Sequence, residues 1–179
     1  ALDSGSTAIT DTFVVTSADG GTTMTVTVTI SGANDAPTIT SSAVTSVNED
    51  AAYTYTVTAA DVDSGDTITL TGTTVPSWAT FTASTGVLAG TPLNANVGAN
   101  SVVITASDGT ASATDTFTIT VANTNDDPTG SVSITGTAQE DQVLGIASLI
   151  ADDDGLGTFS YQWKRAGTAI SGETGLTYT

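Results

Sequence analysis

The chain has 179 residues, and its 19 acidic residues face only Lys164 and Arg165, giving a formal net charge of −17 at pH 7. This charge repels phosphate backbones and anionic membrane surfaces, so nucleic acid is not expected as a partner. No run approaches the roughly 18 to 20 apolar residues that a membrane helix requires, so direct membrane insertion is not expected either. The sequence contains no cysteine and no histidine, which excludes disulfides, thiolate metal sites and imidazole ligands. Zinc, copper and haem sites are therefore not expected.

A short joint sequence occurs twice. Residues 32–37 read GANDAP and residues 123–128 read NTNDDP, so Asn34 recurs as Asn125 after 91 positions. A long-period repeat of this kind is typical of a tandem array of domains. The residue pairs at this spacing are Asn34 and Asn125, Asp35 and Asp126, Glu49 and Glu140, Asp50 and Asp141, Asp61 and Asp152, and Asp63 and Asp154.

The joints predict one complete domain between two partial ones. Residues 1–36 would be the C-terminal part of one domain, residues 37–127 a complete domain, and residues 128–179 the N-terminal part of another. Neither end piece is expected to bury a full core by itself. End-to-end contacts between copies of the chain stay open as an interpretation.

Apolar residues alternate with Thr or Ser along much of the chain, which is the period of a half-buried strand, so the predicted fold class is all-β. The turn Asp19-Gly20-Gly21 predicts a hairpin of residues 12–17 and 22–30. The alternating faces favour tandem Greek-key β-sandwiches, each with two packed sheets. Strands are predicted at residues 38–47, 52–59, 67–72, 78–82, 86–89, 100–106, 112–122, 131–137, 142–150 and 159–165.

The repeated carboxylates and amides suit calcium, a hard cation that binds about six to eight oxygen atoms. In a seven-strand sandwich, the turns after the second and sixth strands return to the end where the chain enters. One ligand set should therefore gather at that end, and Glu49 should lie at the opposite end, where it would meet a second set. The first set is Asn34, Asp35, Asp61, Asp63 and Asp108. The second set is Glu49, Asn125, Asp126, Asp152 and Asp154.

Two other interpretations of these residues stay open. The joint sequence and the acidic turn could each be only a solvated turn, because Asn, Asp, Ser, Gly and Pro are ordinary turn residues. Alternatively, Asp61, Asp63 and Asp66 could form a local cation site within one domain. Repetition of both motifs at one spacing favours calcium at the joints.

Several longer motifs resemble the cadherin superfamily in its bacterial form. Residues 76–81 (PSWATF), 84–92 (STGVLAGTP) and 105–109 (TASDG) are similar to dystroglycan-type cadherin-like (CADG) and bacterial Ig-like repeats. Residues 11–13 and 32–37 resemble the end of a VCBS-type repeat, and residues 151–157 and 161–164 resemble another Ig-like repeat. Such repeats imply a giant RTX-type adhesin on a bacterial cell surface, stiffened by calcium.

The resemblance implies the same ligands as the geometry. Asn34 and Asp35 match the cadherin linker, Asp61 and Asp63 its Asp-x-Asp pair, and Asp108 its Ala-x-Asp carboxylate, while Glu49 matches its first-strand glutamate. Gly32, Ala36 and residues 82–84 depart from the family pattern, which implies fewer ions per joint or weaker binding.

The sequence thus predicts a non-enzymatic, extracellular extender segment that binds Ca²⁺, supports adhesion or biofilm formation, and has neighbouring repeats as its partners. The alternative is a carbohydrate-binding or accessory module of a secreted polysaccharide-degrading enzyme. Its sugar platforms would be aromatic residues, although these fall on predicted core positions: Tyr53, Tyr55, Trp78, Tyr161 and Trp163. With no histidine, nothing obvious activates a nucleophile, so no catalytic residue is predicted.

Overall fold

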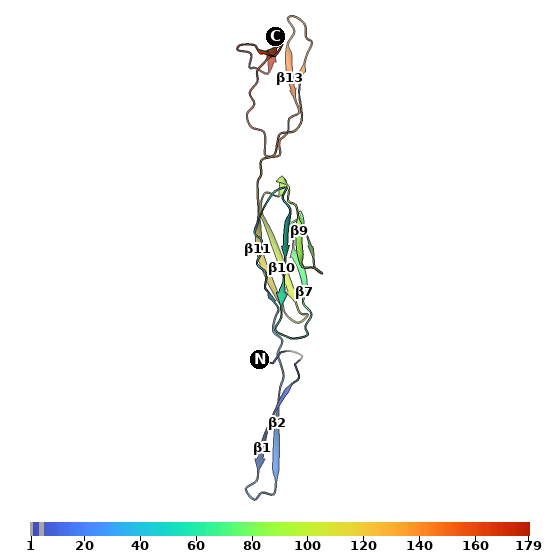
Figure 1. The fold of residues 1–179 in the computed structure, drawn as a ribbon, viewed down its shortest axis with the longest axis vertical. Coiled ribbons are helices and arrows are strands. Elements are labelled where there is room, and N and C mark those ends of the chain that lie inside the picture. Colours follow the sequence, from blue (N-terminus) through green and yellow to red (C-terminus); the bar gives the residue numbers. More distant parts are fainter. Residues whose placement is uncertain (1, 4–5) are drawn as a thin grey trace. The chain divides into compact units, whose positions relative to one another are not determined.

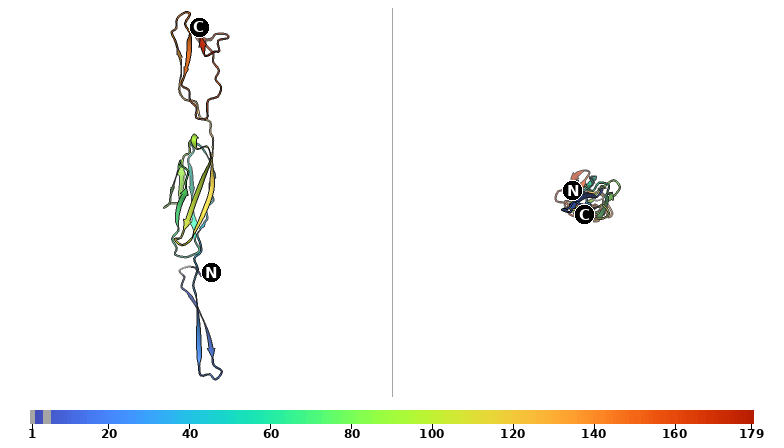
Figure 2. Two further views of the ribbon diagram at one scale, coloured as in Figure 1. Left: turned by 180° about the vertical axis from the view of Figure 1, so that it is seen from behind. Right: turned by 90° about the horizontal axis from the view of Figure 1, so that it is seen from below.

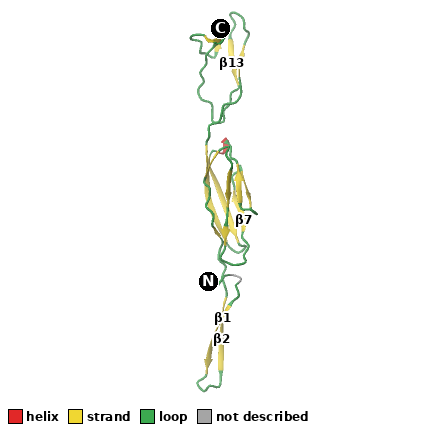
Figure 3. Ribbon diagram, in the orientation of Figure 1, coloured by secondary structure: helices red, strands yellow, loops and turns green. Residues whose placement is uncertain are grey.

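The computed structural model describes residues 2–3 and 6–179, which fall into two compact units, residues 1–123 and 124–179 (Figure 1). Strands and loops make up nearly all of both units, as Figure 3 shows, so the all-β prediction is confirmed. The described residues include one short helical element, the 3-10 turn Asn94–Asn96. Within these described residues, no helix has the length and apolarity needed to span a bilayer.

Unit 1 begins with a two-stranded hairpin, as predicted. Strand β1 (Ile9–Thr16) pairs antiparallel with β2 (Thr23–Ile30), and Phe13 lies opposite Val26. The connecting turn contains Gly20 at a φ of 74°, a left-handed conformation that glycine adopts without steric cost.

The rest of unit 1 is a β-sandwich. Its strands are β3 (Thr38–Ile39), β4 (Ser46–Asn48), β5 (Tyr53–Thr56), β6 (Ala59–Ala60), β7 (Thr69–Thr74), β8 (Ala79–Thr82), β9 (Val87–Gly90), β10 (Gly98–Ser107) and β11 (Ser112–Ala122), drawn from teal through green to yellow in Figure 2. One sheet has the strand order β4-β11-β10-β7, and the other strands form the sheets β5-β9-β8 and β3-β6. These bounds agree with most of the predicted strands.

The core of this sandwich lies between its sheets. Its buried residues are Tyr53, Tyr55, Val57, Leu88, Val102, Ile104 and Ile119. Tyr53 packs edge-on against Trp78, and Tyr55 packs edge-on against Phe117. Alternation along β5, β10 and β11 therefore brings the predicted apolar faces together.

The single strand predicted over residues 38–47 is wrong, because the chain changes sheets there. β3 pairs with β6, whereas β4 runs parallel to β11 in the other sheet. Between them, Ser41 Oγ is hydrogen-bonded to the Tyr55 hydroxyl and accepts the backbone N–H of Thr58. These tertiary contacts hold the crossing segment out of a continuous ladder.

Unit 2 is more open. Strand β12 (Val132–Thr135) pairs with β13 (Leu144–Ser148), which also pairs with β16 (Thr177–Tyr178), and β14 (Lys164–Arg165) pairs with β15 (Thr168–Ala169). The predicted strand over residues 159–165 is wrong for residues 159–163, which form no strand. Trp163 is nevertheless turned inward, as expected: it is buried, stacks on Tyr178 and donates its indole N–H to the Gly175 carbonyl.

Candidate metal centre

The first joint, residues 32–37, is hydrogen-bonded to the acidic turn at residues 61–66, which follows β6. The backbone N–H of Asp35 donates to Oδ2 of Asp63 at 2.7 Å, and the backbone N–H of Asp63 donates to Oδ1 of Asp61 at 3.0 Å. Asp63 is only 2% exposed. The joint backbone is therefore fixed by a buried carboxylate 28 residues farther along the chain.

The turn between β10 and β11 reaches the same joint through Asp108. Oδ2 of Asp108 accepts the side-chain amide of Asn34 at 3.0 Å, and Oδ1 accepts the backbone N–H groups of Thr110 and Ala111. Hydrogen bonds from Ala111, Asn34 and Thr110, in that order of effect, lower the pKa of Asp108. Three loops predicted to converge at this end of the sandwich thus do so in the structure.

The electrostatics of this cluster show mutual repulsion. Desolvation, followed by the charges of Asp63, Asp108 and Asp61, raises the pKa of Asp66. Oδ2 of Asp61 is buried and accepts no hydrogen bond from the described residues. A buried carboxylate oxygen without a donor is costly unless a cation supplies the missing interaction.

The carboxylates of unit 1 lie near one another, but their oxygen atoms do not converge on a single position that an ion could occupy. Among the described residues of this unit, no three acidic side chains have oxygens that all lie within 4.8 Å. A bound ion would therefore also use carbonyl or water oxygens, or draw the side chains closer. Calcium accepts such mixed and flexible oxygen shells.

Gly32 has no room for a side chain. Ala33 forms a β-bridge with Asp3, and a Cβ atom at Gly32 would lie 2.0 Å from the Asp3 carbonyl oxygen. A side chain at position 32 would therefore require the Asp3 backbone to move.

Glu49 lies at the other end of β11 from Asp108, as the strand count predicted. Its backbone N–H donates to the carbonyl of Ala122, and its side chain is 2% exposed. The next residue, Asp50, has a left-handed φ of 58°. The predicted meeting of Glu49 with the second ligand set stays a prediction.

Unit 2 repeats the hydrogen bonds of the first joint. The backbone N–H of Asp126 donates to Oδ2 of Asp154 at 2.6 Å, and that of Asp154 donates to Oδ1 of Asp152 at 2.9 Å. The Asn125 side-chain amide donates to the Asp126 carbonyl, as that of Asn34 does to the Asp35 carbonyl. The sequence repeat is therefore a repeat of geometry.

Asp50 and Asp141, which are related by the 91-residue spacing, have the same unusual backbone conformation. Asp141 has a φ of 59°, within one degree of the value at Asp50. Asp and Asn adopt a positive φ more readily than most other residues, so the residue type was the only sign of this conformation in the sequence. The conformation fixes the direction in which the chain leaves Glu49 and Glu140.

Comparison with known proteins identifies the central domain. Residues 36–122 match a protein-family model described as "Putative Ig domain", and this segment forms an Ig-like β-sandwich. No curated protein sequence matches the chain.

Solved structures with low similarity to the chain include fucoidan hydrolases. The endo-fucoidan hydrolase MfFcnA4 from glycoside hydrolase family 107 is 18% identical with a TM-score of 0.41, and the match covers 82% of this chain and 33% of that one. For MfFcnA9 of the same family, the values are 21%, 0.35, 64% and 22%. The chain thus spans about a third or less of these enzymes.

Proposed function

We propose that the chain is a calcium-rigidified extender segment of a bacterial surface adhesin or extracellular filament, with Ca²⁺ bound at the domain joints. The observation that carries this proposal is the hydrogen-bonded acidic joint around the buried Oδ2 of Asp61, whose pattern recurs 91 residues later. A solvated turn has no need of a buried carboxylate oxygen, so the calcium interpretation accounts for more of the geometry.

In unit 1, the proposed ligands come from three loops. Asp61 and Asp63 supply carboxylates from the acidic turn, Asp108 supplies one from the turn after β10, and Asn34 and Asp35 supply oxygens from the joint. In unit 2, Asn125, Asp126, Asp152 and Asp154 have the equivalent roles, and Glu49 is a further proposed ligand for that second set.

A bound cation would replace the repulsion between the joint carboxylates by attraction of each carboxylate to the ion. Two unit charges 4 Å apart repel by roughly 4 kcal/mol at an effective dielectric constant of 20. Extracellular calcium modules bind with dissociation constants of about 10⁻⁴ to 10⁻³ M, and calcium at about 100 times that constant stabilises a site by about 2.7 kcal/mol. The joint would be flexible without calcium and rigid with calcium bound.

The carbohydrate-binding alternative fits the aromatic residues less well. Tyr53, Tyr55 and Trp163 are buried, and Trp78 packs on Tyr53 while its indole N–H donates to Asn100. Sugar platforms need an exposed ring face, so these rings serve the core. Within this proposal the chain is extracellular, has no catalytic role and has neighbouring repeats as its partners.

A calorimetric calcium titration tests the binding. The unaltered chain should bind calcium, and Asp61→Asn should weaken binding to unit 1 at least tenfold because it removes charge but keeps side-chain size. Asp115→Asn is the matched control, since Asp115 lies on β11 outside the proposed ligand set, and should bind like the unaltered chain. Absence of binding at 10 mM calcium would reject the metal centre.

Small-angle X-ray scattering tests the extender role separately. Scattering profiles of the chain should indicate a stiffer particle in calcium than in chelator. Equal flexibility in both conditions, in a chain that binds calcium, would leave the metal site intact but reject rigidification as its purpose.

A further inference from the structure

Strand β11 of the central domain has a free edge along its first half. One edge of β11 pairs with β10 from Ser112 to Val121, but the other edge pairs with β4 only at residues 120–122. In Figure 1, β11 and β7 are labelled on opposite sides of this domain. Residues 112–118 of β11 therefore form an edge that no strand among the described residues covers.

This gap follows from the path of the chain inside the central domain. β3 pairs with β6, and the chain then crosses to the other sheet, where β4 joins β11. Ser41 Oγ is hydrogen-bonded to the Tyr55 hydroxyl, which fixes the start of the crossing segment. The Val44 carbonyl accepts the Tyr53 hydroxyl at 2.7 Å, which fixes its end. The crossing segment is therefore held in place and leaves the first half of β11 uncovered.

The free edge presents backbone groups that can pair with another strand. The N–H of Thr120 donates to the Thr45 carbonyl on the β4 side of β11. Alternate residues of a strand point their backbone groups the same way, so the N–H and C=O groups of Thr114, Thr116 and Thr118 face that side too. Unpaired groups in such a row are a template for the addition of an extended chain.

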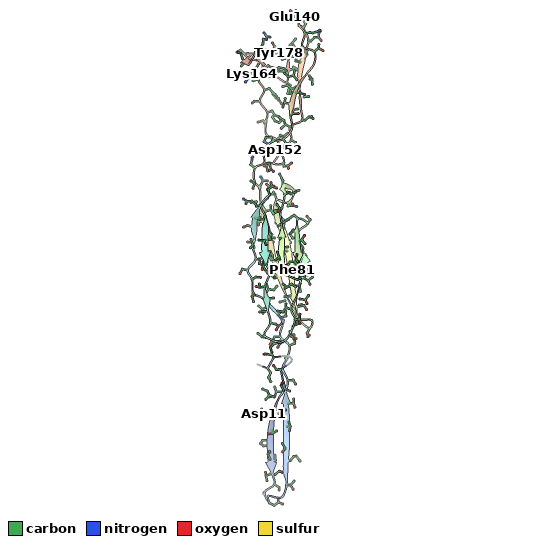
Figure 4. All side chains as sticks on the ribbon, turned by 45° about the vertical axis from the view of Figure 1, so that its right-hand side comes forward. Asp11, Phe81, Glu140, Asp152, Lys164 and Tyr178 are labelled. Carbon is green, nitrogen blue, oxygen red and sulfur yellow. The ribbon has the colours of Figure 1, made fainter. Side chains whose placement is uncertain are left out.

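A groove beside this edge has room for the side chains of an added strand. Its volume is about 270 Å³, and its lining includes Thr38 and Ile39 of β3 and Ala113 and Asp115 of β11. Figure 4 shows the side chains of this domain as sticks, with Phe81 of β8 labelled. Because successive side chains of a strand point to opposite faces, every second side chain of an added strand would enter the groove.

Asp115 determines which charge the groove accepts. It lies opposite the buried Ile104, so its half-buried side chain is on the inward face of β11. No hydrogen bond or ion pair joins its carboxylate to the described residues. Residues 1–123 contain neither lysine nor arginine, since the two basic residues of the chain are Lys164 and Arg165. A partly buried ion pair is screened less than an exposed one, so a cation from a partner would bind favourably here.

We propose that the free edge of β11 and its groove bind an extended peptide segment of a partner protein. The segment adds to the sheet as a further strand and places a lysine or arginine side chain beside Asp115. Backbone hydrogen bonds supply affinity in this mode of recognition, and alternate side chains supply specificity. Apolar side chains two positions before and after the basic residue would contact Ile39 and Ala113. The binding uses no residue of the proposed calcium set and does not rest on the proposed function.

Fluorescence anisotropy with a labelled, capped heptapeptide tests this binding. The probe TVTKTVT places one lysine and two valines on one face of a strand and threonines on the other. The full chain, titrated in calcium and in chelator, should bind this probe saturably in both conditions. The counterpart TVTETVT has a glutamate in place of the lysine and should bind at least tenfold more weakly.

A charge-removing variant tests the role of Asp115. Asp115→Asn should weaken binding of the lysine peptide at least fivefold and reduce the preference over the glutamate peptide. Asp11→Asn is the matched control, since Asp11 is exposed on β1 and lies outside the groove, and it should bind like the unaltered chain. Asp115→Asn should still bind calcium, so failure of the peptide proposal is distinguishable from failure of the calcium site.

Methylated peptides test strand addition without altering the protein. An N-methyl group removes one backbone donor and blocks close approach of a neighbouring strand. Methylation of the threonine amides and methylation of the valine and lysine amides affect opposite edges of the peptide. One pattern should abolish binding, and the other should leave it within about twofold of the unmethylated probe.

Four results would overturn the proposal. The first is the absence of saturable binding of the lysine peptide, and the second is equal binding of the lysine and glutamate peptides. The third is equal weakening by Asp115→Asn and Asp11→Asn, because the peptide would then respond only to the net charge of the chain. The fourth is an equal effect of the two methylation patterns, because the peptide would then not pair with a strand edge.

Discussion

The backbone N–H of Asp35 donates a 2.7 Å hydrogen bond to Oδ2 of Asp63, and this contact ties a domain joint to a buried carboxylate. The same contact joins Asp126 to Asp154 at 2.6 Å in unit 2. A neutral turn could hold the joint by backbone contacts alone. Asp63 is buried and Asp154 is exposed, but a carboxylate accepts the joint N–H at both places, and calcium binding explains this shared use of an acid.

Substitutions of Asp63 should separate its hydrogen bond from its charge. Asp63→Ala leaves the N–H of Asp35 without its acceptor and should cost about 1–3 kcal/mol of unfolding free energy even in chelator. Asp63→Asn keeps an acceptor oxygen, so it should cost less in chelator and yet lose most of the stabilisation by calcium. Chemical denaturation of both variants, with and without calcium, measures the two effects.

If Asp63→Ala and Asp63→Asn were equally stable in chelator, the hydrogen bond from the Asp35 N–H would not contribute to the stability of the chain. If Asp63→Asn kept the full calcium-induced stabilisation, the Asp63 charge would not contribute to binding.

Asp66→Asn should stabilise the chain in chelator at neutral pH. The folded state raises the pKa of Asp66 through desolvation and the charges of Asp63, Asp108 and Asp61, so its ionised form opposes folding. The advantage of the variant should be complete above the raised pKa and should vanish below 3.8, the ordinary pKa of an aspartate, where both side chains are neutral. Melting temperatures in chelator across this pH range provide the measurement.

In calcium, Asp66→Asn should leave the melting temperature unchanged or lower it, because the cation already offsets the repulsion between the carboxylates. A variant less stable than the unaltered chain in chelator would show that Asp66 is held by favourable contacts instead.

Leu88→Ala should destabilise the central sandwich whether or not calcium is present. Leu88 is fully buried among the core residues, and such truncations cost about 2–5 kcal/mol. Leu93→Ala is the matched control, since Leu93 is 59% exposed and should change stability by less than about 0.5 kcal/mol. Thermal unfolding of both variants in chelator compares them directly.

The sequence was sufficient to predict which acidic residues of unit 1 gather. Counting strands gives the end at which each turn emerges, and the contacts of Asn34 with Asp108 and of Asp35 with Asp63 confirm that count. Apart from the strand predicted over residues 38–47, the strands predicted for the central domain from alternation agree with the structure, and Tyr53, Tyr55 and Val57 share one buried face.

Features that depend on distant partners were not predictable. The chain changes sheets between β3 and β4 because Ser41 bonds to Tyr55 and Thr58, and local sequence contains no trace of those contacts. Residues 159–163 alternate like a strand but form none, since a strand also needs a neighbour to pair with. The closure of Gly32 by Asp3 is likewise a tertiary effect.

Asp154→Asn should reduce the number of calcium ions bound by the chain. Asp154 accepts the Asp126 N–H and belongs to the proposed ligand set of unit 2, whereas its neighbour Asp153 has neither property. Asp153→Asn is therefore a matched control for charge and position. Equilibrium dialysis should show fewer ions for the first variant and an unchanged number for the second. Equal losses would mean that calcium responds only to net charge.

The most direct measurement is a thermal unfolding scan of the 179-residue chain in millimolar calcium and again in excess chelator. Calcium binding at the joints predicts a clear upward shift of the melting temperature with calcium, and Asp61→Asn should reduce that shift while Asp115→Asn keeps it. Superimposable melting curves in calcium and chelator would contradict the account, because the acidic turns would then be solvated loops.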